Sequence, residues 1–320
     1  MIRETALLQL IQAKGLGNST LNLILTQIRE MGYSLVDFVT ASTFVMTNEF
    51  GLDSNIAHSI KNAQENADRL YEELQKKEIK IIIKGTPEYP SQILRILKET
   101  APPILFVKGN TNLLNSKSIG FCGSRNVSEK GIQIAYECAT ELSQKGINII
   151  SGYARGVDLT THKAALRSGG STIFVIAEGI LQFKEKKEVH EYLSIDNFLV
   201  ISEFQPRLPW KAHNAMQRNR TICGLSRALI LIESRKNGGT FEAGRTALEL
   251  QQPLFVVEYA HPEISAEGNK YFLERGAIAL RSNRQGKPKL DNVFYVLNNN
   301  ISKRIENNVQ MNFLDSICFE

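Results

Sequence analysis

The sequence has few of the features that mark secreted, membrane-spanning or metal-binding proteins. Its four cysteines stand at positions 122, 138, 223 and 318 without a Cys-x-x-Cys pair, so neither a disulfide framework nor a zinc site is predicted. No apolar run approaches the roughly 20 residues that cross a membrane. The N-terminus, MIRETALLQL, lacks the small-residue cleavage site of a signal peptide. We therefore expect a cytoplasmic protein with no metal and no membrane partner.

An excess of charge of one sign is also nearly absent. The chain has 38 Lys and Arg against 33 Asp and Glu, a formal net charge of +5. Charged residues make up 22% of the chain and apolar residues 42%, which is ordinary for a globular protein and excludes a disordered one. So small an excess does not by itself indicate a polyanionic partner. The positions of the cations therefore matter more than their number.

Residues 1–77 have a helical pattern, and 320 residues are enough for more than one domain. Apolar positions recur at helical spacing on both sides of the turn Lys14-Gly15-Leu16-Gly17, and a long helix is predicted over 54–77. Helix, glycine turn and helix resemble a helix-hairpin-helix (SAM-like) module, in which turn amides face a phosphate. A plain helical bundle is the alternative for this N-terminal domain.

Residues 78–281 change to short apolar runs that alternate with amphipathic segments. Continuous apolar strands between helices are typical of a parallel sheet covered on both faces, so we predict an α/β, Rossmann-like domain with a mostly parallel sheet. The predicted helices include Glu129–Gln144, Asp158–Arg167 and Thr240–Leu250. The eight predicted strands are Ile79–Ile83, Ile104–Val107, Ile119–Cys122, Ile147–Ile150, Thr172–Ile176, Phe198–Ile201, Ala228–Ile232 and Leu254–Val257. Residues 282–320 are predicted to be a linker and a short C-terminal segment, with an amphipathic helix over 301–317.

Glycine and arginine residues cluster in four predicted loops next to these strands, and Arg218-Asn219-Arg220 is one of the loops. In open α/β sheets ligands bind beyond the carboxyl ends of the strands, where glycine lets the backbone approach a ligand and arginine offers a forked donor to phosphate. The four segments together predict a pocket for a phosphate-bearing ligand, each being weak evidence alone. The candidate residues are Gly123, Ser124 and Arg125; Ser151, Gly152, Ala154, Arg155, Gly156, Asp158 and His162; Arg218, Asn219 and Arg220; and Gly238, Gly239 and Thr240.

These segments contain no signature of a known cofactor or catalytic site. There is no G-x-G-x-x-G fingerprint and no Gly-Lys-Ser/Thr ending of a P-loop, and no nucleophile has an evident general base. We expect Asp158 to cap a helix and His162 to fix the loop before it. If the segments only bind a phosphate-bearing ligand, neither a cofactor nor a catalytic residue is predicted.

The order of short motifs resembles the DNA-processing protein A family, known as DprA or Smf. The resemblance runs from the N-terminal hairpin to about Leu280, and so many motifs in one order are specific. The motifs are Glu88-Tyr89-Pro90, Pro102-Pro103-Ile104-Leu105-Phe106, Gly123-Ser124-Arg125, Ser151-Gly152-x-Ala154-x-Gly156-x-Asp158 with His162, Ser202-Glu203, Arg218-Asn219-Arg220, Gly268-Asn269 and Gly276-Ala277.

What this resemblance implies is a non-enzymatic protein that binds and protects single-stranded DNA and loads a RecA-type recombinase in DNA uptake and recombination. The family's Rossmann-like domain dimerises, so a homodimer is implied, with the candidate residues above holding the DNA. One departure concerns base stacking: where the family has phenylalanine and proline before Arg-Asn-Arg, this chain has Ala215-Met216-Gln217. Trp210 or Tyr153 would then supply the aromatic surface.

A second departure leaves other functions open. The segment Gly238-Gly239-Thr240-Phe241-Glu242 resembles the LOG-type nucleotide phosphoribohydrolases. In that reading Arg218 or Arg220 grips the phosphate and Glu242 acts at the ribose. A nucleotide-signal sensor that uses the same pocket is a third interpretation. The structural alternative is that Glu242 lies in the first turn of a helix and interacts favourably with the helix N-terminus, without any catalytic or sensing role.

Overall fold

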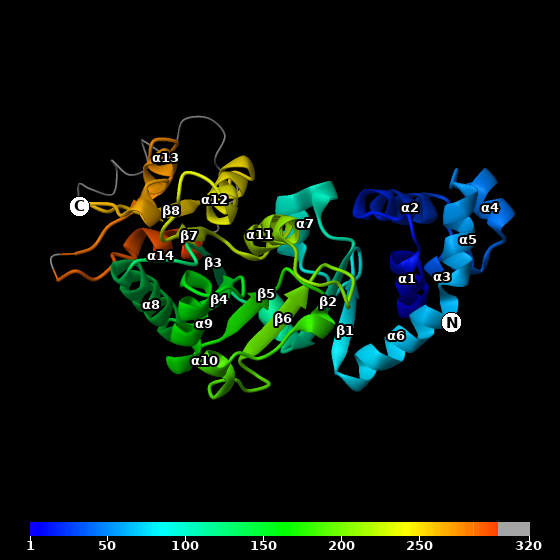
Figure 1. Cartoon of the computed structure of the whole chain (residues 1–320), viewed down its shortest axis with the longest axis horizontal. Helices are drawn as coiled ribbons and strands as arrows, with labels where there is room; N and C mark the ends of the chain where they lie inside the picture. The colour runs from blue at the N-terminus through cyan, green and yellow to red at the C-terminus, as the bar shows by residue number, and fades with distance from the viewer. Residues whose placement is uncertain (284, 300–320) are drawn as a thin grey trace.

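The computed structural model describes residues 1–283 and 285–299. Its N-terminal part is a bundle of helices, which Figure 1 shows beside the edge strand of the sheet. The predicted single helix over 54–77 is wrong, because the amide of Ala63 donates to the carbonyl of Ile60, three residues back, and this tighter turn separates two helices. The bundle consists of α1 (Arg3–Gln12), α2 (Asn18–Glu30), α3 (Leu35–Thr40), α4 (Thr43–Asn48), α5 (Ser54–Asn62) and α6 (Gln64–Lys76).

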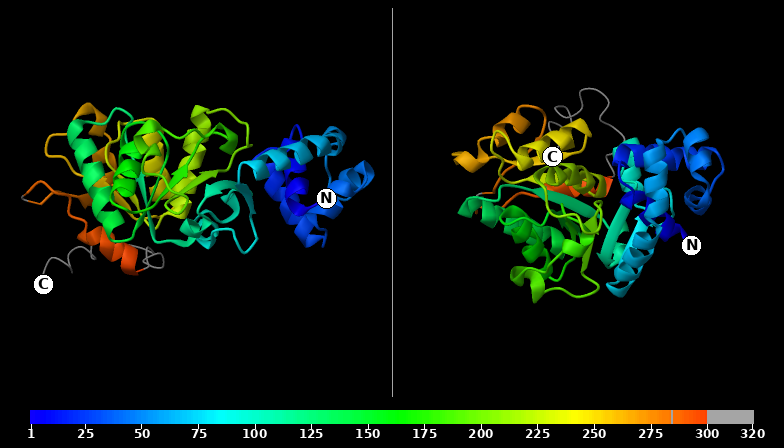
Figure 2. Two further views of the ribbon diagram at one scale, coloured as in Figure 1. Left: turned by 90° about the horizontal axis from the view of Figure 1, so that it is seen from below. Right: turned by 45° about the vertical axis from the view of Figure 1, so that its right-hand side comes forward.

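The core of the bundle continues onto the sheet. Leu7, Phe38 and Leu74 are buried in one cluster with Phe106 of the sheet. Polar contacts join the same parts, since the side-chain amide of Gln205 donates to a carbonyl of α1 and Arg207 pairs with Glu73 of α6. The two views in Figure 2 show the bundle next to the same end of the sheet.

A single nine-stranded sheet forms the centre of the molecule, in the order β1-β2-β6-β5-β4-β3-β7-β8-β9. The seven strands β6-β5-β4-β3-β7-β8-β9 are all parallel to their neighbours within this group. The pairs β1–β2 and β2–β6 are antiparallel. The predicted α/β class with a mostly parallel sheet is confirmed. The strands are β1 (Ile79–Ile83), β2 (Ile104–Gly109), β3 (Ser118–Cys122), β4 (Asn148–Ser151), β5 (Thr172–Val175), β6 (Phe198–Ser202), β7 (Leu229–Leu231), β8 (Leu254–Val257) and β9 (Ile278–Leu280). All eight predicted strands are present, and β9 was missed.

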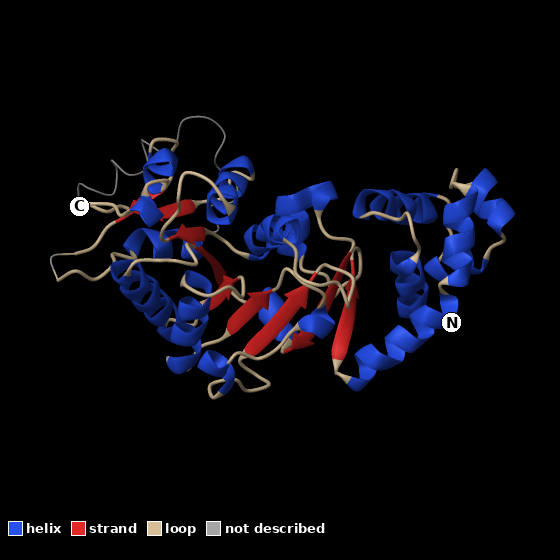
Figure 3. Ribbon diagram, in the orientation of Figure 1, coloured by secondary structure: helices blue, strands red, loops and turns tan. Residues whose placement is uncertain are grey.

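Helices cover both faces of this sheet (Figure 3). Ile119 and Phe121 of β3 pack in one cluster with α8 (Glu129–Gln144) and α9 (Val157–Arg167), while Cys122 packs on the opposite face with α11 (Ala212–Leu225) and α12 (Gly239–Glu249). This alternation is the period of two that a strand imposes. The remaining helices are α7 (Ser91–Leu97), α10 (Lys187–His190), α13 (Asn269–Leu273) and α14 (Asp291–Asn299), with 3-10 turns η1 (Lys98–Thr100), η2 (Thr111–Asn115), η3 (Ile180–Gln182) and η4 (Ile264–Ala266).

The order of the strands places a topological switch point between β3 and β7. From β3 the chain adds β4, β5 and β6 on one side and then crosses through α11 to β7 on the other side. A crevice forms at such a point because the two neighbouring strands send their connections in opposite directions. The fold therefore places a binding crevice beyond the carboxyl ends of β3 and β7.

The last described element, α14, packs on the body of the domain. Val293 and Leu297 are buried in the cluster that contains Ile119, and the guanidinium of Arg227 donates to the carbonyl of Leu297 at 2.7 Å. The amphipathic helix predicted over 301–317 lies outside the described residues. Within residues 1–283 and 285–299, no helix has the length and apolar character to cross a membrane.

Candidate functional site

A cavity of about 510 Å³ opens at the switch point, between the loops that follow β3 and β7. Each of the four predicted segments contributes to its wall, although the segments lie far apart in the sequence. The lining includes ten of the predicted residues: Gly123, Ser124, Arg125, Ala154, Asp158, Arg218, Asn219, Gly238, Gly239 and Thr240.

Two glycines allow the loops after β3 and β4 to touch. A Cβ added at Gly123 would lie 2.3 Å from Cγ2 of Val157, and one at Gly156 would lie 2.4 Å from the carbonyl oxygen of Ser124. Gly156 also has a φ of 82°, which L side chains rarely adopt. Both positions therefore need glycine, and the backbone of one loop supports the other.

Arg218 extends from α11 into the base of this pocket. Its side chain is 7% exposed, and its guanidinium occupies the space beside Gly152, where an added Cβ would lie 1.8 Å from Nη1. Burial lowers the pKa of Arg218, while Asp158 opposes this shift. Its Nε is buried and has no hydrogen-bond partner among the described residues. A buried cation with an unused donor is the group that an anionic ligand satisfies.

Asp158 holds the loop after β4 instead of capping α9. The helix begins at Val157, one residue earlier, and the carboxylate of Asp158 accepts from Ser151 Oγ at 2.9 Å and from the amide of Ala154 at 3.2 Å. Burial raises its pKa, while Arg218 and the two hydrogen bonds oppose this shift. The predicted helix cap is therefore wrong, because both carboxylate oxygens bond to the loop.

His162 fixes the same loop from behind, as predicted. Its Nε2 donates to the carbonyl of Gly152, and its Nδ1 lies 2.6 Å from the hydroxyl of Thr172. The ring is fully buried, and burial lowers its pKa to about 3, so it is neutral near neutral pH. Ser151, Gly152 and His162 are all buried and lie outside the pocket lining, so they support its wall.

The rim of the pocket has an exposed aromatic ring between cations. The indole of Trp210 is 49% exposed, and the guanidinium of Arg125 lies 5.3 Å from the ring centroid. Arg155 is exposed next to it and donates to Asn126 Oδ1 at 3.0 Å. A smaller cavity of about 420 Å³ adjoins the first and shares Arg125, Trp210 and Arg218 with it. The surface is therefore longer than one pocket.

The loop after β7 brings backbone amides to the opposite wall. Gly238 has a φ of 96° and is the N-cap of α12, and no heavy atom lies within 4 Å of a Cβ added at Gly238 or Gly239. Asn219 ties this loop to α11 by donating to the carbonyl of Gly239 at 3.0 Å. The first amides of a helix lack partners within the helix and carry its positive end, so this wall also suits an anion.

Sequence reasoning missed three side chains near the site. Arg235 and Met216, which is 44% exposed, line the pocket. Lys186 reaches the carbonyl of Tyr153 and lies 4.2 Å from the centroid of that ring. Burial lowers the pKa of Lys186, with Asp158 opposing. The run Lys184–Glu188 alternates in charge, and this pattern does not single out Lys186 as a site residue.

Arg220 does not share the pocket with Arg218. The predicted loop at 218–220 is wrong, because these residues lie within α11, where side chains two positions apart point about 200° apart. Arg220 donates to the hydroxyl of Thr100 at 3.3 Å and lines a different cavity. Glu242 pairs with Arg245 at 3.4 Å and lines neither cavity. The alternative catalytic pair, Glu242 and Arg220, is therefore not brought together.

The sheet order and the pocket define a Rossmann-like α/β protein with a cationic, glycine-walled crevice at its switch point. A family model described as DNA recombination-mediator protein A matches residues 80–287, and the chain belongs to this family. This confirms the resemblance noted from the sequence motifs.

Individual relatives agree with the family. The DNA processing protein DprA of Streptococcus pneumoniae is 34% identical over 185 residues, which are 57% of this chain and 64% of that protein. The chain thus spans less than two thirds of this relative. The X-ray structure of DNA processing protein A from S. pneumoniae shares the fold, with a TM-score of 0.74, 24% identity and coverage of 88% of this chain and 95% of that one. A structure of the Helicobacter pylori protein, reported for its single-stranded DNA binding mode, has a TM-score of 0.55 at 24% identity and covers 69% and 94%.

Proposed function

We propose that this chain binds single-stranded DNA in the crevice between β3 and β7. The observation that carries the proposal is Arg218, a buried guanidinium with an unpartnered Nε at the base of an open pocket. Keeping such a cation away from water is costly unless an anion completes its hydrogen bonds. In a protein of the DNA recombination-mediator family, a DNA phosphate is the anion of choice.

The rim supports a strand in preference to a single small nucleotide. Trp210 offers an exposed π surface, and Arg125 and Arg155 flank it along two adjoining cavities. Alternation of stacking surfaces and cations is how proteins hold single strands without reading their sequence. The H. pylori structure, reported for its single-stranded DNA binding mode, is consistent with this choice.

We assign a role to each of these residues, and its position in the crevice supports the assignment. Arg125, Arg155 and Arg218 contact phosphates, the amides at Gly238 to Thr240 receive a further one, and Trp210 stacks on a base. Gly123 and Gly156 keep the two loops together, and Ser151, Asp158 and His162 hold Gly152 beneath Arg218.

The family relationship supports a further step. We propose that the protein acts as a homodimer and delivers the bound strand to a RecA-type recombinase during transformation or recombination, as the resemblance implies. Stimulation of recombinase filament formation on coated single strands, and a dimeric mass in solution, are the measurements that test these two statements.

A filter-binding titration with an oligodeoxythymidylate at several salt concentrations tests the DNA-binding function. We expect saturable binding that weakens steeply with salt, while a blunt duplex of the same length binds less tightly. Binding that ignores salt, or no binding, would overturn the proposal. Release of free base from a nucleoside monophosphate, abolished in Glu242→Gln, would establish the hydrolase instead.

A further inference from the structure

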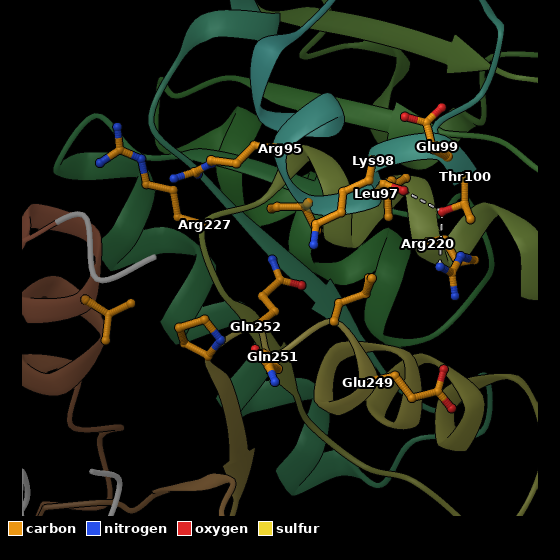
Figure 4. Close-up of a pocket in the computed structure, with 14 residues that line it drawn as sticks. Arg95, Leu97, Lys98, Glu99, Thr100, Arg220, Arg227, Glu249, Gln251 and Gln252 are labelled. Atoms are coloured by element: carbon orange, nitrogen blue, oxygen red, sulfur yellow. Dashed lines mark hydrogen bonds between the residues drawn. The ribbon is translucent and has the colours of Figure 1, made fainter. Parts of the chain in front are cut away.

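A second cavity, of about 710 Å³, lies at the opposite ends of the central strands. Its wall includes Arg227, which precedes β7, and Gln252 and Pro253, which precede β8, so it opens at the amino ends of these strands. The pocket proposed above lies at their carboxyl ends. Figure 4 shows the labelled side chains around this space, which come from α7 and η1, from α11 and the segment after it, from the end of α12, and from the turn before β8.

Cations outnumber carboxylates in this cavity, and each of its two carboxylates lies near a cation outside the lining. Glu99 has a 97% exposed side chain and lies 3.8 Å from Lys84, and Glu249 lies 3.5 Å from Arg245. Neither of these two cations lines the cavity. Four others do: Arg95, Lys98, Arg220 and Arg227. Among the described residues, Lys98, Arg220 and Arg227 form no ion pair with a carboxylate.

Two of these cations, Arg220 and Arg227, bond to neutral oxygens. Arg220 donates to the hydroxyl of Thr100 at 3.3 Å, and Arg227 donates to the carbonyl of Leu297 at 2.7 Å. Each guanidinium has five N–H donors, so most of this capacity is left for a ligand. An anion that enters the cavity therefore meets Lys98, Arg220 and Arg227, which form no ion pair with a carboxylate of the described residues.

The backbone at the cavity is unusual at two positions. Lys98 has a φ of 50° with a ψ of −124°, and Gln251 has a φ of 52°. Both are L residues in a region where glycine is favoured, and both line the cavity. Strained residues of this kind persist where the surrounding structure holds them, often at binding sites. Lys98 therefore combines a strained backbone with a cationic side chain at the cavity.

Apolar side chains complete the wall beside the cations. Leu97, Leu250, Pro253 and Val296 line the cavity. Its volume is within the range of small-molecule sites, which combine apolar walls with a few placed polar groups. A ligand with one phosphate and one flat apolar part matches this combination.

We propose that this cavity is a second binding site for the phosphate group of a nucleotide. Lys98 contacts the phosphate, Arg220 and Arg227 add positive charge on either side of it, and the apolar wall packs against the sugar and base. The nucleotide is either free in solution or part of a DNA strand that reaches this edge of the sheet. The first case is independent of the DNA-binding function proposed above, and the second rests on it.

The test compares variants of the full chain with two probes. The probes are dAMP, followed by broadening of its phosphorus NMR resonance, and a labelled oligodeoxythymidylate, followed by anisotropy. Lys98→Gln removes the charge, Lys98→Gly removes the charge and the backbone strain together, and Lys98→Arg keeps the charge. Lys145→Gln is the matched control, because Lys145 is exposed at the end of α8, away from both cavities.

We expect both charge-removing variants to weaken binding of at least one probe about tenfold, with Lys98→Arg and Lys145→Gln close to wild type. Lys98→Gly should also melt no lower than wild type, because glycine relieves the strained φ, and this separates lost binding from lost folding. Loss confined to dAMP identifies a free nucleotide, and loss confined to the oligonucleotide identifies a DNA strand. The loss caused by Lys98→Gln should persist in an Arg125→Gln background, so failure of the other pocket is recognised separately. The proposal is overturned if neither probe distinguishes Lys98→Gln from Lys145→Gln.

Discussion

The guanidinium of Arg218 occupies the space that a side chain at Gly152 would fill. An added Cβ would lie 1.8 Å from Nη1 of Arg218 and 2.3 Å from Oδ2 of Asp158. His162 holds this position from behind through the carbonyl of Gly152. The absence of one side chain therefore sets where the buried cation of the pocket lies.

Gly152→Ala should displace Arg218 and weaken binding of single-stranded DNA. The methyl group cannot share its space with the guanidinium, and overpacking of this kind costs about 1–3 kcal/mol of stability. Urea unfolding and oligonucleotide titration measure the two effects. Gly17→Ala is the control for the effect of an added methyl group on stability, because Gly17 has no atom within 4 Å of an added Cβ and has a φ of −87°. Wild-type DNA affinity in Gly152→Ala would show that the position of Arg218 is irrelevant to binding.

Trp210→Ala should weaken DNA binding without changing its dependence on salt. A stacked aromatic contributes about 1–3 kcal/mol per base and neutralises no phosphate. The indole is 49% exposed, so its loss should leave the free energy of unfolding almost unchanged. Trp210→Phe keeps a π surface and should retain most of the affinity. If alanine and phenylalanine at this position bind alike, Trp210 does not stack on a base.

Glu203 makes the stability of the fold depend on pH. Burial raises its pKa from 4.5 to about 7, while Thr221, Gln217 and the nearby arginines oppose this shift. Its Oε2 accepts from the hydroxyl of Thr221 at 2.9 Å, and its Oε1 has no partner in the described part of the chain. Between pH 4.5 and 7 the folded protein keeps a proton that the unfolded chain loses, so this group lowers stability as pH rises.

Glu203→Gln should remove this penalty. The variant should be more stable than wild type at pH 8, by on the order of 3 kcal/mol, and nearly equal to it at pH 4.5. Urea unfolding of both proteins at the two pH values measures the difference in their free energies of unfolding. The contributions of the other titrating groups are the same in both proteins and cancel in this difference. A variant that is less stable than wild type at pH 8 would contradict this account of Glu203.

The strands could be predicted because each buried strand reads as a continuous apolar run. Ile79–Ile83 and Leu254–Val257 match to the residue, whereas β9 has only three residues after Gly276-Ala277 and gives no such run. The antiparallel pairing of β1 and β2 could not be predicted, since the direction of a strand leaves no mark on its composition.

The pocket could be predicted in outline but not in its detail. Glycines at the ends of β3 and β7 located the crevice, because the fold class dictates where ligands bind. The separation of Arg218 from Arg220 depends on α11, whose amphipathic pattern is weak, so a loop seemed the simpler interpretation of the sequence. Lys186 and Arg235 reach the site through tertiary packing, which no local pattern encodes.

Phosphates of single-stranded DNA should bind Arg125 and Arg218 in the crevice between β3 and β7. The most direct test is the slope of log affinity against log salt for an oligodeoxythymidylate, compared between wild type and the double variant Arg125→Gln with Arg218→Gln. Each lost phosphate contact should reduce the steepness by about 0.7, so we predict a slope shallower by about 1.4. Equal slopes for the two proteins would contradict the claim.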